Sequence, residues 1–291
     1  MPFRSGTIAL VGRPNAGKST LLNALVGASI AAVSDKPQTT RIRLHGILTT
    51  DTFQARLVDT PGLHLAKSEL NRRMVGEAER AMADVDVIAY LADATREFDD
   101  ELVGRLQGQK VVVALNKIDL LADKAAMLPL IAQYAVLGPV IPISAAKNDG
   151  LQQLCAEWCA RLPEGERQYD ADQLTDAPEK QITAELIREQ VVRRLEKELP
   201  YVTAVEIEKF DETRRELGKV QIFARIVVEK PSQKAIVIGA GGAMVKAIGN
   251  ASRKRIEELL GCRVDLKLFV AVEKDWTSNP RRLHEFGYTD K

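Results

Sequence analysis

The chain has 291 residues, and its 41 Lys+Arg nearly balance its 40 Asp+Glu, giving a formal net charge of +1 at pH 7. Hydrophobic residues account for 45% and charged residues for 28%, which is ordinary for soluble globular proteins, and the length allows two domains. Three cysteines exclude a disulfide framework, and we interpret Cys155 and Cys159 as structural thiols. Apolar runs such as residues 85–92 are too short to span a membrane, and no signal-like segment is present, so we expect a cytoplasmic protein.

Charge is divided unevenly along the chain. Residues 1–180 carry 20 Lys+Arg and 23 Asp+Glu, whereas residues 181–291 carry 21 and 17. Between Glu229 and Glu257 the sequence has no acidic residue and six basic ones, Lys230, Lys234, Lys246, Arg253, Lys254 and Arg255. Such a cluster is typical of a surface that binds a polyanion, although a solvated helix face would have the same composition.

Residues 12–19 fit the pattern G-x-x-x-x-G-K-[ST] between an apolar run at 7–11 and a helix-like run at 20–27. Small residues in this pattern leave successive backbone N–H groups open to phosphate groups, at the positive end of the following helix. The sequence therefore predicts a bound nucleoside triphosphate, with Lys18 at its β and γ phosphates and Ser19 at magnesium. A turn that binds nothing is the alternative. The expected nucleotide contacts here are Gly12, Arg13, Pro14, Asn15, Ala16, Gly17, Lys18, Ser19 and Thr20.

A second polar segment, Asp59-Thr60-Pro61-Gly62, follows the apolar run at 55–58. A carboxylate at this point can hold magnesium through water, while the backbone N–H groups after it sense the γ-phosphate. We therefore assign Asp59 to the metal site and Gly62 to a switch segment. The pattern D-x-x-G is common, and its weight here comes from the phosphate loop upstream.

A third segment predicts which base is bound. Asn116-Lys117-Ile118-Asp119 follows the apolar run at 111–115, which places it at the carboxyl edge of a parallel sheet. The Asp119 carboxylate can accept hydrogen bonds from the ring N–H and the exocyclic amine of guanine, whereas adenine offers neither donor. GTP is therefore expected rather than ATP, and helix capping by Asn116 and Asp119 is the alternative. Ser144, Ala145 and Ala146 complete the expected guanine contacts.

Taken together, these segments resemble the translation-factor class of GTPases. The polar segment at 31–41 is then expected to be the first switch, in which family patterns place a magnesium-binding threonine directly before an arginine. We choose Thr40, with Thr39 as the alternative. With Ser19 and Asp59, Thr40 would complete the metal site.

Hydrolysis must differ from that in GTPases that orient water with a glutamine, because the matching position here is Leu63. This apolar residue resembles the group that includes the Era, tRNA-modification and Der-type GTPases, whose phosphate loops often carry an asparagine that helps to hold potassium. Asn15 matches that asparagine, so we hypothesise potassium-stimulated turnover; a role in the loop turn alone is the alternative. We assign no catalytic role to His64 and expect slow turnover, about 10⁻² to 10⁻⁴ per second. The expected catalytic residues are Asn15, Lys18, Thr40 and Gly62.

The second half of the chain has a different pattern. Residues 166–180 are acidic, polar and interrupted by proline, which is typical of a linker, so we place one domain at 1–165 and another at 181–291. The second domain is expected to have a helix-strand-strand-helix-helix-strand order. Its clearest elements are a helix at 182–199, strands at 203–210 and 219–228, a helix at 243–260 and a strand at 264–272.

A G-x-x-G sequence, Gly239-Ala240-Gly241-Gly242, stands before the helix at 243–260 and resembles the core of a type II KH domain. Nearly bare backbone at such a loop lets a nucleic-acid strand approach, so that about four nucleotides can be clamped. The loop lacks the lysine or polar residue usual in the family, which gives more weight to Lys246, Lys234 and backbone N–H groups. A glycine turn without a ligand is the alternative. The expected RNA contacts are Lys234, Gly239, Ala240, Gly241, Gly242, Lys246 and Arg253.

The segment 276–288, with a short helix expected after Pro280, extends the resemblance over nearly the whole chain, which is identified as a member of the Era-type GTPases. The resemblance implies an α/β P-loop GTPase domain with a mostly parallel six-stranded sheet and helices on both faces, followed by a smaller α+β KH domain. It also implies Mg²⁺ and GTP or GDP as ligands. The RNA partner that it implies is the 3′ end of 16S ribosomal RNA, during assembly of the small ribosomal subunit.

The resemblance also sets the remaining expectations. We expect a monomer, and the family suggests weak peripheral contact with the inner membrane, although the sequence has no long basic amphipathic helix. GTPases that drive RNA modification, and factors with two GTPase domains, carry a catalytic cysteine motif, a helical insertion or a second phosphate loop, which this sequence lacks. The remaining alternative is an RNA-binding module that uses GTP as a structural ligand with negligible turnover.

Overall fold

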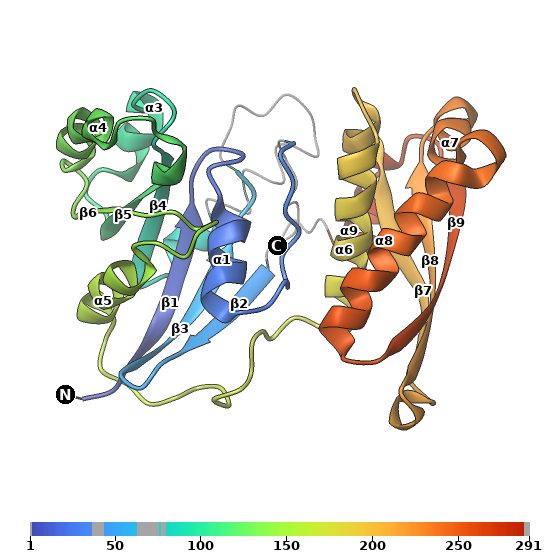
Figure 1. Ribbon diagram of the computed structural model, residues 1–291, viewed down its shortest axis with the longest axis horizontal. Helices are drawn as coiled ribbons and strands as arrows, with labels where there is room; N and C mark the ends of the chain where they lie inside the picture. The colour runs from blue at the N-terminus through green and yellow to red at the C-terminus, as the bar shows by residue number, and fades with distance from the viewer. Residues whose placement is uncertain (1, 37–43, 63–75, 77–79, 288–291) are drawn as a thin grey trace. The chain divides into compact units, whose positions relative to one another are not determined.

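The computed structural model describes residues 2–36, 44–62, 76 and 80–287 (Figure 1). Within them the chain forms two compact units. The first unit takes in residues 2–28, 44–62, 76 and 80–176, and the second takes in residues 29–36 and 177–287. Residues 166–176, which the sequence placed in a linker, are thus part of the first unit.

The first unit is built on a six-stranded sheet with the order β2-β3-β1-β4-β5-β6. β2 pairs antiparallel with β3, and the other neighbours are parallel. The strands are β1 (Arg4–Val11), β2 (Leu44–Thr49), β3 (Phe53–Asp59), β4 (Val87–Asp93), β5 (Val111–Asn116) and β6 (Val140–Pro142). Because Leu10 is aligned with Asp59 and Asp93 with Asn116, the carboxyl ends of four parallel strands meet at one edge. The predicted mostly parallel six-stranded sheet is confirmed.

The helices of the first unit include α1 (Lys18–Val26), α3 (Asp100–Leu106), α4 (Met127–Tyr134) and α5 (Leu151–Arg161), with 3₁₀ turns at Ile118–Leu120 and Lys124–Ala126. α3 and α4 pack on the sheet face that carries alternate residues of β1 and β4, where Val11, Tyr90 and Tyr134 share one buried cluster. α1 packs closely on β2, since a Cβ added at Gly46 would lie 3.0 Å from Val26. These contacts fix the turns at the carboxyl edge of the sheet.

β2 is an edge strand of this sheet, and the segment after α5 runs beside it. The Ile47 N–H donates to the Leu174 carbonyl oxygen at 2.8 Å. On the neighbouring strand, the buried Gln54 side chain donates to the Tyr169 carbonyl oxygen at 2.9 Å and accepts from the Gln168 N–H at 2.7 Å. An open edge strand is prone to pairing with other chains, so these bonds both cover the edge and hold the segment.

The second unit contains a three-stranded sheet with the order β7-β8-β9, in which β7 and β8 are antiparallel and β8 and β9 are parallel. Its elements are α6 (Glu179–Arg194), β7 (Ala204–Asp211), β8 (Lys219–Val228), α7 (Pro231–Ile238), α8 (Ala243–Leu260), β9 (Arg263–Val272) and α9 (Pro280–Glu285). Val191, Ile226, Val237 and Ile248 belong to one buried cluster, so α6, α7 and α8 pack on the same face of the sheet. The predicted helix-strand-strand-helix-helix-strand order is confirmed.

The first helix of the second unit ends earlier than the sequence predicted. We expected residues 182–199, but α6 ends at Arg194, and Leu195 is extended with φ −92° and ψ 149°. Lys197 has left-handed backbone with φ 55°, which a continuous right-handed helix cannot include, and a separate 3₁₀ helix, Leu199–Val202, follows. The apolar spacing continues past the helix because Leu195 and Leu199 are both buried. Burial was therefore mistaken for helix periodicity.

α7 and α8 meet at a bend of 44°, at the glycine turn that joins them (Figure 1). In the described part of the chain, no single helix is long and apolar enough to cross a membrane. The bent pair formed by α7 and α8 passes the same test by length and composition alone.

Candidate nucleotide and RNA sites

The phosphate loop joins β1 to α1, and Lys18 lies at its centre. The Lys18 side chain is buried, and its Nζ donates to the carbonyl oxygens of Gly12 and Arg13, each at 3.1 Å. Burial lowers the pKa of Lys18 to about 8, while the nearby Asp59 raises it in part. α1 has no acidic residue in its first turn, so its N-terminus keeps its positive character. The loop is therefore built to receive an anion such as a phosphate.

Ser19 and Asp59 come together beside this loop. Ser19 Oγ donates to Asp59 Oδ2 at 2.6 Å, and Asp59 is fully buried at the end of β3. A hydroxyl and a carboxylate are oxygen donors of the kind that Mg²⁺ prefers, so the residues present fit the predicted metal. Thr60 is engaged elsewhere, because its Oγ1 donates to the Leu10 carbonyl oxygen at 2.8 Å. The third expected metal ligand, Thr40, lies outside the described residues.

One buried side chain, that of Asn116, connects three of the predicted motifs. Its Nδ2 donates to the carbonyl oxygen of Ala16 in the phosphate loop at 2.8 Å, and its Oδ1 accepts from the N–H of Ala145 at 3.0 Å. All three residues are buried, so the side chain holds together the phosphate loop and the two segments predicted to contact guanine. Asp119 lies on the 3₁₀ turn Ile118–Leu120 and is exposed, where a base can reach its carboxylate.

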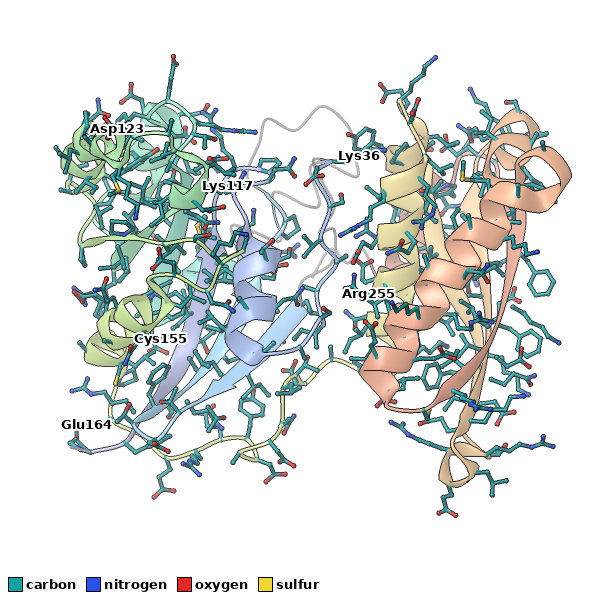
Figure 2. The ribbon with its side chains drawn as sticks, in the orientation of Figure 1. Lys36, Lys117, Asp123, Cys155, Glu164 and Arg255 are labelled. Atoms are coloured by element: carbon teal, nitrogen blue, oxygen red, sulfur yellow. The ribbon has the colours of Figure 1, made fainter. Side chains whose placement is uncertain are left out.

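Lys117, labelled in Figure 2, is held by the neighbouring strand. Its backbone is left-handed, with φ 68°, and its Nζ donates to Asp93 Oδ2 at 2.7 Å. Burial alone would raise the pKa of Asp93, but hydrogen bonds from Lys117 and Thr95 outweigh burial and lower it. Sequence reasoning missed Asp93. Its signal was an aspartate directly after the apolar run at 87–92, which the strand order places beside Asn116.

The Arg13 side chain contacts α3 instead of its own loop. Its Nε and Nη2 donate to the two carboxylate oxygens of Asp99, at 2.5 and 2.7 Å. Asp99 is buried and caps α3 by accepting from the Leu102 N–H, and its own N–H donates to the Tyr134 hydroxyl at 3.3 Å. This network ties the phosphate loop to α3 and α4, and it leaves the Arg13 backbone for any nucleotide contact. Nothing local in the sequence pairs these residues.

Two backbone features concern the residues expected to act in hydrolysis. Gly62 lies against Pro14, since a Cβ at this position would be 2.6 Å from the Pro14 nitrogen, so only glycine fits. Asn15 has φ 65°, a conformation that asparagine adopts more readily than most residues. This is what a role in the loop turn requires, and the potassium hypothesis stays a prediction. Leu63 and His64 lie outside the described residues.

In the second unit, the turn between α7 and α8 presents open backbone. At Gly239 (φ 74°, ψ 173°) an added Cβ would lie 2.7 Å from Met244 Cβ, so the close turn requires glycine. Ala240 is exposed, and a Cβ added at Gly241 or Gly242 would have no neighbouring atom within 4 Å. The 18-residue α8 follows directly and has no acidic residue in its first turn. An RNA phosphate could therefore approach backbone N–H groups at a positive helix end.

The basic residues around this turn differ in their surroundings. Lys246 and Arg253 are exposed on α8, and a spacing of seven residues places them about two turns apart on one face. Lys234 is half-buried on α7. Arg255, labelled in Figure 2, instead forms an ion pair with the buried Glu189 of α6 at 3.1 Å. Of the basic residues between Glu229 and Glu257, some are therefore candidates for RNA contact, whereas Arg255 has a structural partner within the domain.

Two family descriptions match the chain. Residues 7–117 match the family described as 50S ribosome-binding GTPase, and residues 198–277 match the KH domain. Over 296 residues the chain is 46% identical to the GTPase Era of Geobacter metallireducens, which covers 99% of both proteins. It is also 46% identical to the GTPase Era of Xylella fastidiosa over 296 residues, covering 99% of the chain and 98% of that protein. The chain belongs to the Era family of GTPases.

Two solved Era structures resemble the whole chain. One is Era in complex with MgGDPNP and nucleotides 1506–1542 of 16S ribosomal RNA, with a TM-score of 0.93 and 34% identity. The other is an Aquifex aeolicus Era variant bound to GDP·AlF4⁻, with a TM-score of 0.92 and 35% identity. Each comparison covers 98% of this chain and 99% of the other. This Era chain is therefore a GTPase with a KH domain, as the sequence predicted.

In the segment Ser144–Ala146, the last of those predicted to contact guanine in this Era chain, one residue is buried and shapes the turn, and another is exposed. Ser144 is buried, and its Oγ accepts from the Lys147 N–H at 3.2 Å. Ala146 is exposed. With Asp119 on the turn after β5, these residues lie at the same edge of the sheet as the phosphate loop. The structure thus brings the predicted nucleotide residues together wherever it describes them.

Proposed function

We propose that this Era chain binds and hydrolyses GTP with Mg²⁺, and that its KH domain binds the 3′ end of 16S ribosomal RNA during assembly of the small ribosomal subunit. The observation that carries the proposal is the chain-wide likeness to an Era structure that contains both MgGDPNP and nucleotides 1506–1542 of that RNA. The geometry of the two candidate sites supports each half of the proposal separately.

For the nucleotide, Ser19 and Asp59 would hold Mg²⁺, joined by Thr40 when the γ-phosphate is present. The ion supplies neutralisation of charge on the phosphate oxygens. Lys18 already lies against the carbonyl oxygens of its loop, where it can exchange those acceptors for phosphate oxygens. Asp119 would select guanine, because adenine leaves the carboxylate desolvated and without a donor.

For hydrolysis we propose that Asn15 helps to hold a potassium ion at the phosphates, since the position of the usual glutamine is Leu63. Turnover should then be faster in potassium than in sodium at equal ionic strength. Asn15→Ala should abolish the difference between the two salts without abolishing GDP binding. Equal turnover of the unaltered protein in both salts would remove this part of the proposal.

For coupling, we propose that nucleotide state acts through residues 29–36, which precede Thr40 in the chain but belong to the second unit. There the Val33 carbonyl oxygen accepts from Arg193 Nη2 at 2.7 Å, and the Val33 N–H donates to Glu189 at 3.2 Å. Binding of Thr40 at the metal would restrain the same short segment. By linkage, RNA and GTP would then change each other's affinity by equal factors.

The decisive experiment is RNA binding by fluorescence anisotropy at stated salt, with the 16S 3′-end sequence and a scrambled copy, in GTP analogue and in GDP. Selective binding that is stronger with the GTP analogue supports the proposal. Weak binding that ignores both sequence and nucleotide would overturn the RNA half, and would leave a GTPase whose glycine turn serves another partner.

A further inference from the structure

The face of the second sheet that lies opposite α6, α7 and α8 carries an unusual set of side chains. Along β8, Val220, Ile222 and Ala224 are fully buried under the helices. Alternate residues of a strand point to opposite faces, so Lys219, Gln221 and Phe223 lie on the other face, together with their partners on β7 and β9. The outer sheet face, as we call it, also takes in Arg225 and its partners, and comprises Glu206, Lys209, Asp211, Lys219, Gln221, Phe223, Arg225, Arg263, Asp265, Lys267 and Phe269.

Aromatic and basic side chains alternate across this face. Phe223 is aligned with Lys209 on one neighbouring strand and Lys267 on the other, with the two ammonium groups 5.8 and 5.1 Å from the ring centroid. The ring therefore holds two cations in place on an open surface. Next to Lys267 on the same face, Phe269 is 52% exposed, which is high for a residue of this size.

At the end of the face nearest the turn between β7 and β8, several basic side chains have no acidic partner among the described residues. Lys219 is aligned directly with Arg263, and like charges on adjacent strands destabilise a sheet. Asp211 pairs with Lys209 at 2.7 Å, and Asp265 accepts from Gln221 at 3.1 Å. Within the described residues, no carboxylate pairs with Lys219, Arg263, Lys267 or Arg214. Further along β8 on the same face, by contrast, Arg225 is aligned with Phe269 and is paired with Glu206 and Glu273.

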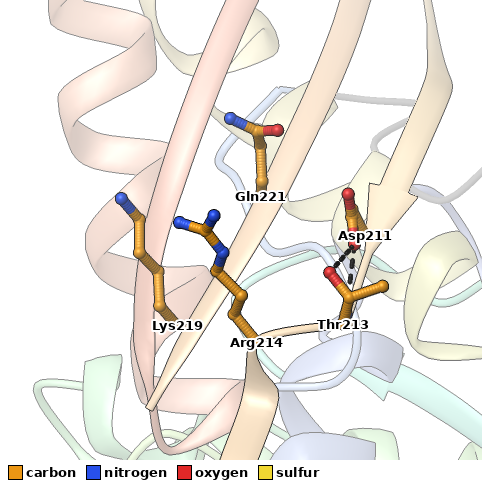
Figure 3. Close-up of a pocket in the computed structure, with 5 residues that line it drawn as sticks. All are labelled: Asp211, Thr213, Arg214, Lys219 and Gln221. Carbon is orange, nitrogen blue, oxygen red and sulfur yellow. Dashed lines mark hydrogen bonds between the residues drawn. The ribbon is translucent and has the colours of Figure 1, made fainter. Parts of the chain in front are cut away.

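The same end of the face, near the turn between β7 and β8, also contains a cavity. A cavity of about 250 Å³ is lined by Asp211, Thr213, Arg214, Lys219 and Gln221. Figure 3 shows the long side chains of Arg214 and Lys219 standing side by side at this cavity, while Thr213 is turned toward Asp211. Thr213 Oγ1 donates to Asp211 Oδ1 at 2.7 Å, so the one carboxylate that lines the cavity already has a hydrogen-bond partner. A small, open cavity lined by two cations, neither of them paired with a carboxylate in the described part of the chain, suits a phosphate group better than an apolar ligand.

We propose that the outer sheet face is a second RNA contact, where Lys219, Arg263 and Arg214 hold backbone phosphates and Phe269 stacks a base. This inference rests on the proposed RNA-binding function and extends it to nucleotides beyond the roughly four that a glycine turn can clamp. Cations that repel one another gain most from an added polyanion, and an exposed ring beside lysines is the usual platform for a single strand.

The test compares a short single-stranded RNA, long enough for the glycine turn alone, with an RNA covering nucleotides 1506–1542. In the double variant Lys219→Gln/Arg263→Gln, affinity for the long RNA should fall about 25-fold at 0.1 M salt, and the salt slope should become shallower by about 1.4, the values for two phosphate contacts. Affinity for the short RNA should not change. Phe269→Ala should weaken the long RNA by about fivefold or more.

The control Lys110→Gln/Lys124→Gln removes the same charge from exposed lysines of the first unit and should leave both RNAs unaffected. All four substituted residues of the two double variants are exposed, and removal of the Lys219–Arg263 repulsion should not lower the unfolding temperature. If the unaltered protein binds neither RNA, the proposed function fails. If it binds both and the double variant matches it on the long RNA, only the second contact is refuted. Binding of the double variant to anionic vesicles and to an acidic protein is measured in parallel. If the variant loses affinity only for these and keeps its affinity for the long RNA, the second RNA contact is also refuted.

Discussion

The Asn116 side chain forms hydrogen bonds with the Ala16 carbonyl and the Ala145 N–H, and both backbone groups are buried. If these bonds are lost, water cannot replace them. Asn116→Ala leaves the Ala16 carbonyl and the Ala145 N–H buried without partners. An unsatisfied buried group costs about 1–3 kcal/mol; because GDP binding would have to restore the loop positions that Asn116 sets, GDP affinity should fall by about 5- to 150-fold. Titration calorimetry with GDP measures this directly. Asn250→Ala, on the exposed surface of α8, is the control, and an Asn116→Ala protein with unchanged GDP affinity would contradict the assignment.

Cys155 gives a prediction about pH. Burial raises the pKa of its thiol from 9.0 to about 11, with a smaller contribution from Cys159. Only the thiolate is alkylated, so its rate with iodoacetamide should rise about tenfold per pH unit and should not level off below pH 10. The variant Cys159→Ser/Cys262→Ser isolates this thiol. The same variant in denaturant is the control and should level off near the ordinary pKa. A plateau near pH 9 in the folded protein would show that burial has no such effect.

At single positions, the sequence predicted residues whose role depends on a motif, and it missed residues whose role depends on a distant partner. Lys18, Ser19 and Asp59 could be chosen because their neighbours in the chain define the chemistry. Asp93 and Asp99 could not, because their partners Lys117 and Arg13 come within reach only when β4 lies between β1 and β5. Strand order is a property of the fold, and no local pattern states it.

Among the elements, the edge strand β2 depends on the segment that follows α5. Gln54→Ala would remove the side chain that binds both Gln168 and Tyr169. The free energy of unfolding should fall by about 1–3 kcal/mol, since several hydrogen bonds worth about 1 kcal/mol each are lost. Trypsin should also cleave after Arg167 at least about fivefold faster, because the segment opens more often. Gln153→Ala, exposed on α5, is the control, and an unchanged cleavage rate would refute this role for Gln54.

Element boundaries were predictable where the chain itself carries the stop signals. β8 at 219–228 and α8 at 243–260 match the predicted ranges, because glycines stand at or next to both ends of α8 and at the start of β8. α6 does not match, since Leu195 and Leu199 are buried for reasons of packing rather than helix periodicity. Polar composition made residues 166–176 look like a linker, yet their backbone groups bond to β2 and β3. A polar composition shows that a segment can be solvated, but it does not show whether water or another part of the protein takes its hydrogen bonds.

At the scale of the whole molecule, the proposed coupling depends on a short length of chain. Thr40 comes four residues after Lys36, the last described residue of the segment that belongs to the second unit. Four residues span at most about 14 Å, so Thr40 bound at the metal would restrict where the segment that docks Val33 on α6 can lie. Under the proposal the free energies of metal binding and docking are linked, and the link would be carried by the Arg193 guanidinium, which donates to the Val33 carbonyl oxygen through both Nε and Nη2.

Arg193→Ala should therefore uncouple the two ligands without removing either site. In the unaltered protein, RNA affinity in GTP analogue and in GDP should differ by about 5- to 150-fold, the usual range of such coupling. In the variant this ratio should approach one, while GDP affinity measured without RNA changes less than twofold. Arg194→Ala is the matched control, because its guanidinium donates to Gln190 on the same helix and not to Val33. A variant that keeps the full ratio would show that the segment moves without α6, and that nucleotide state reaches the KH domain by another route.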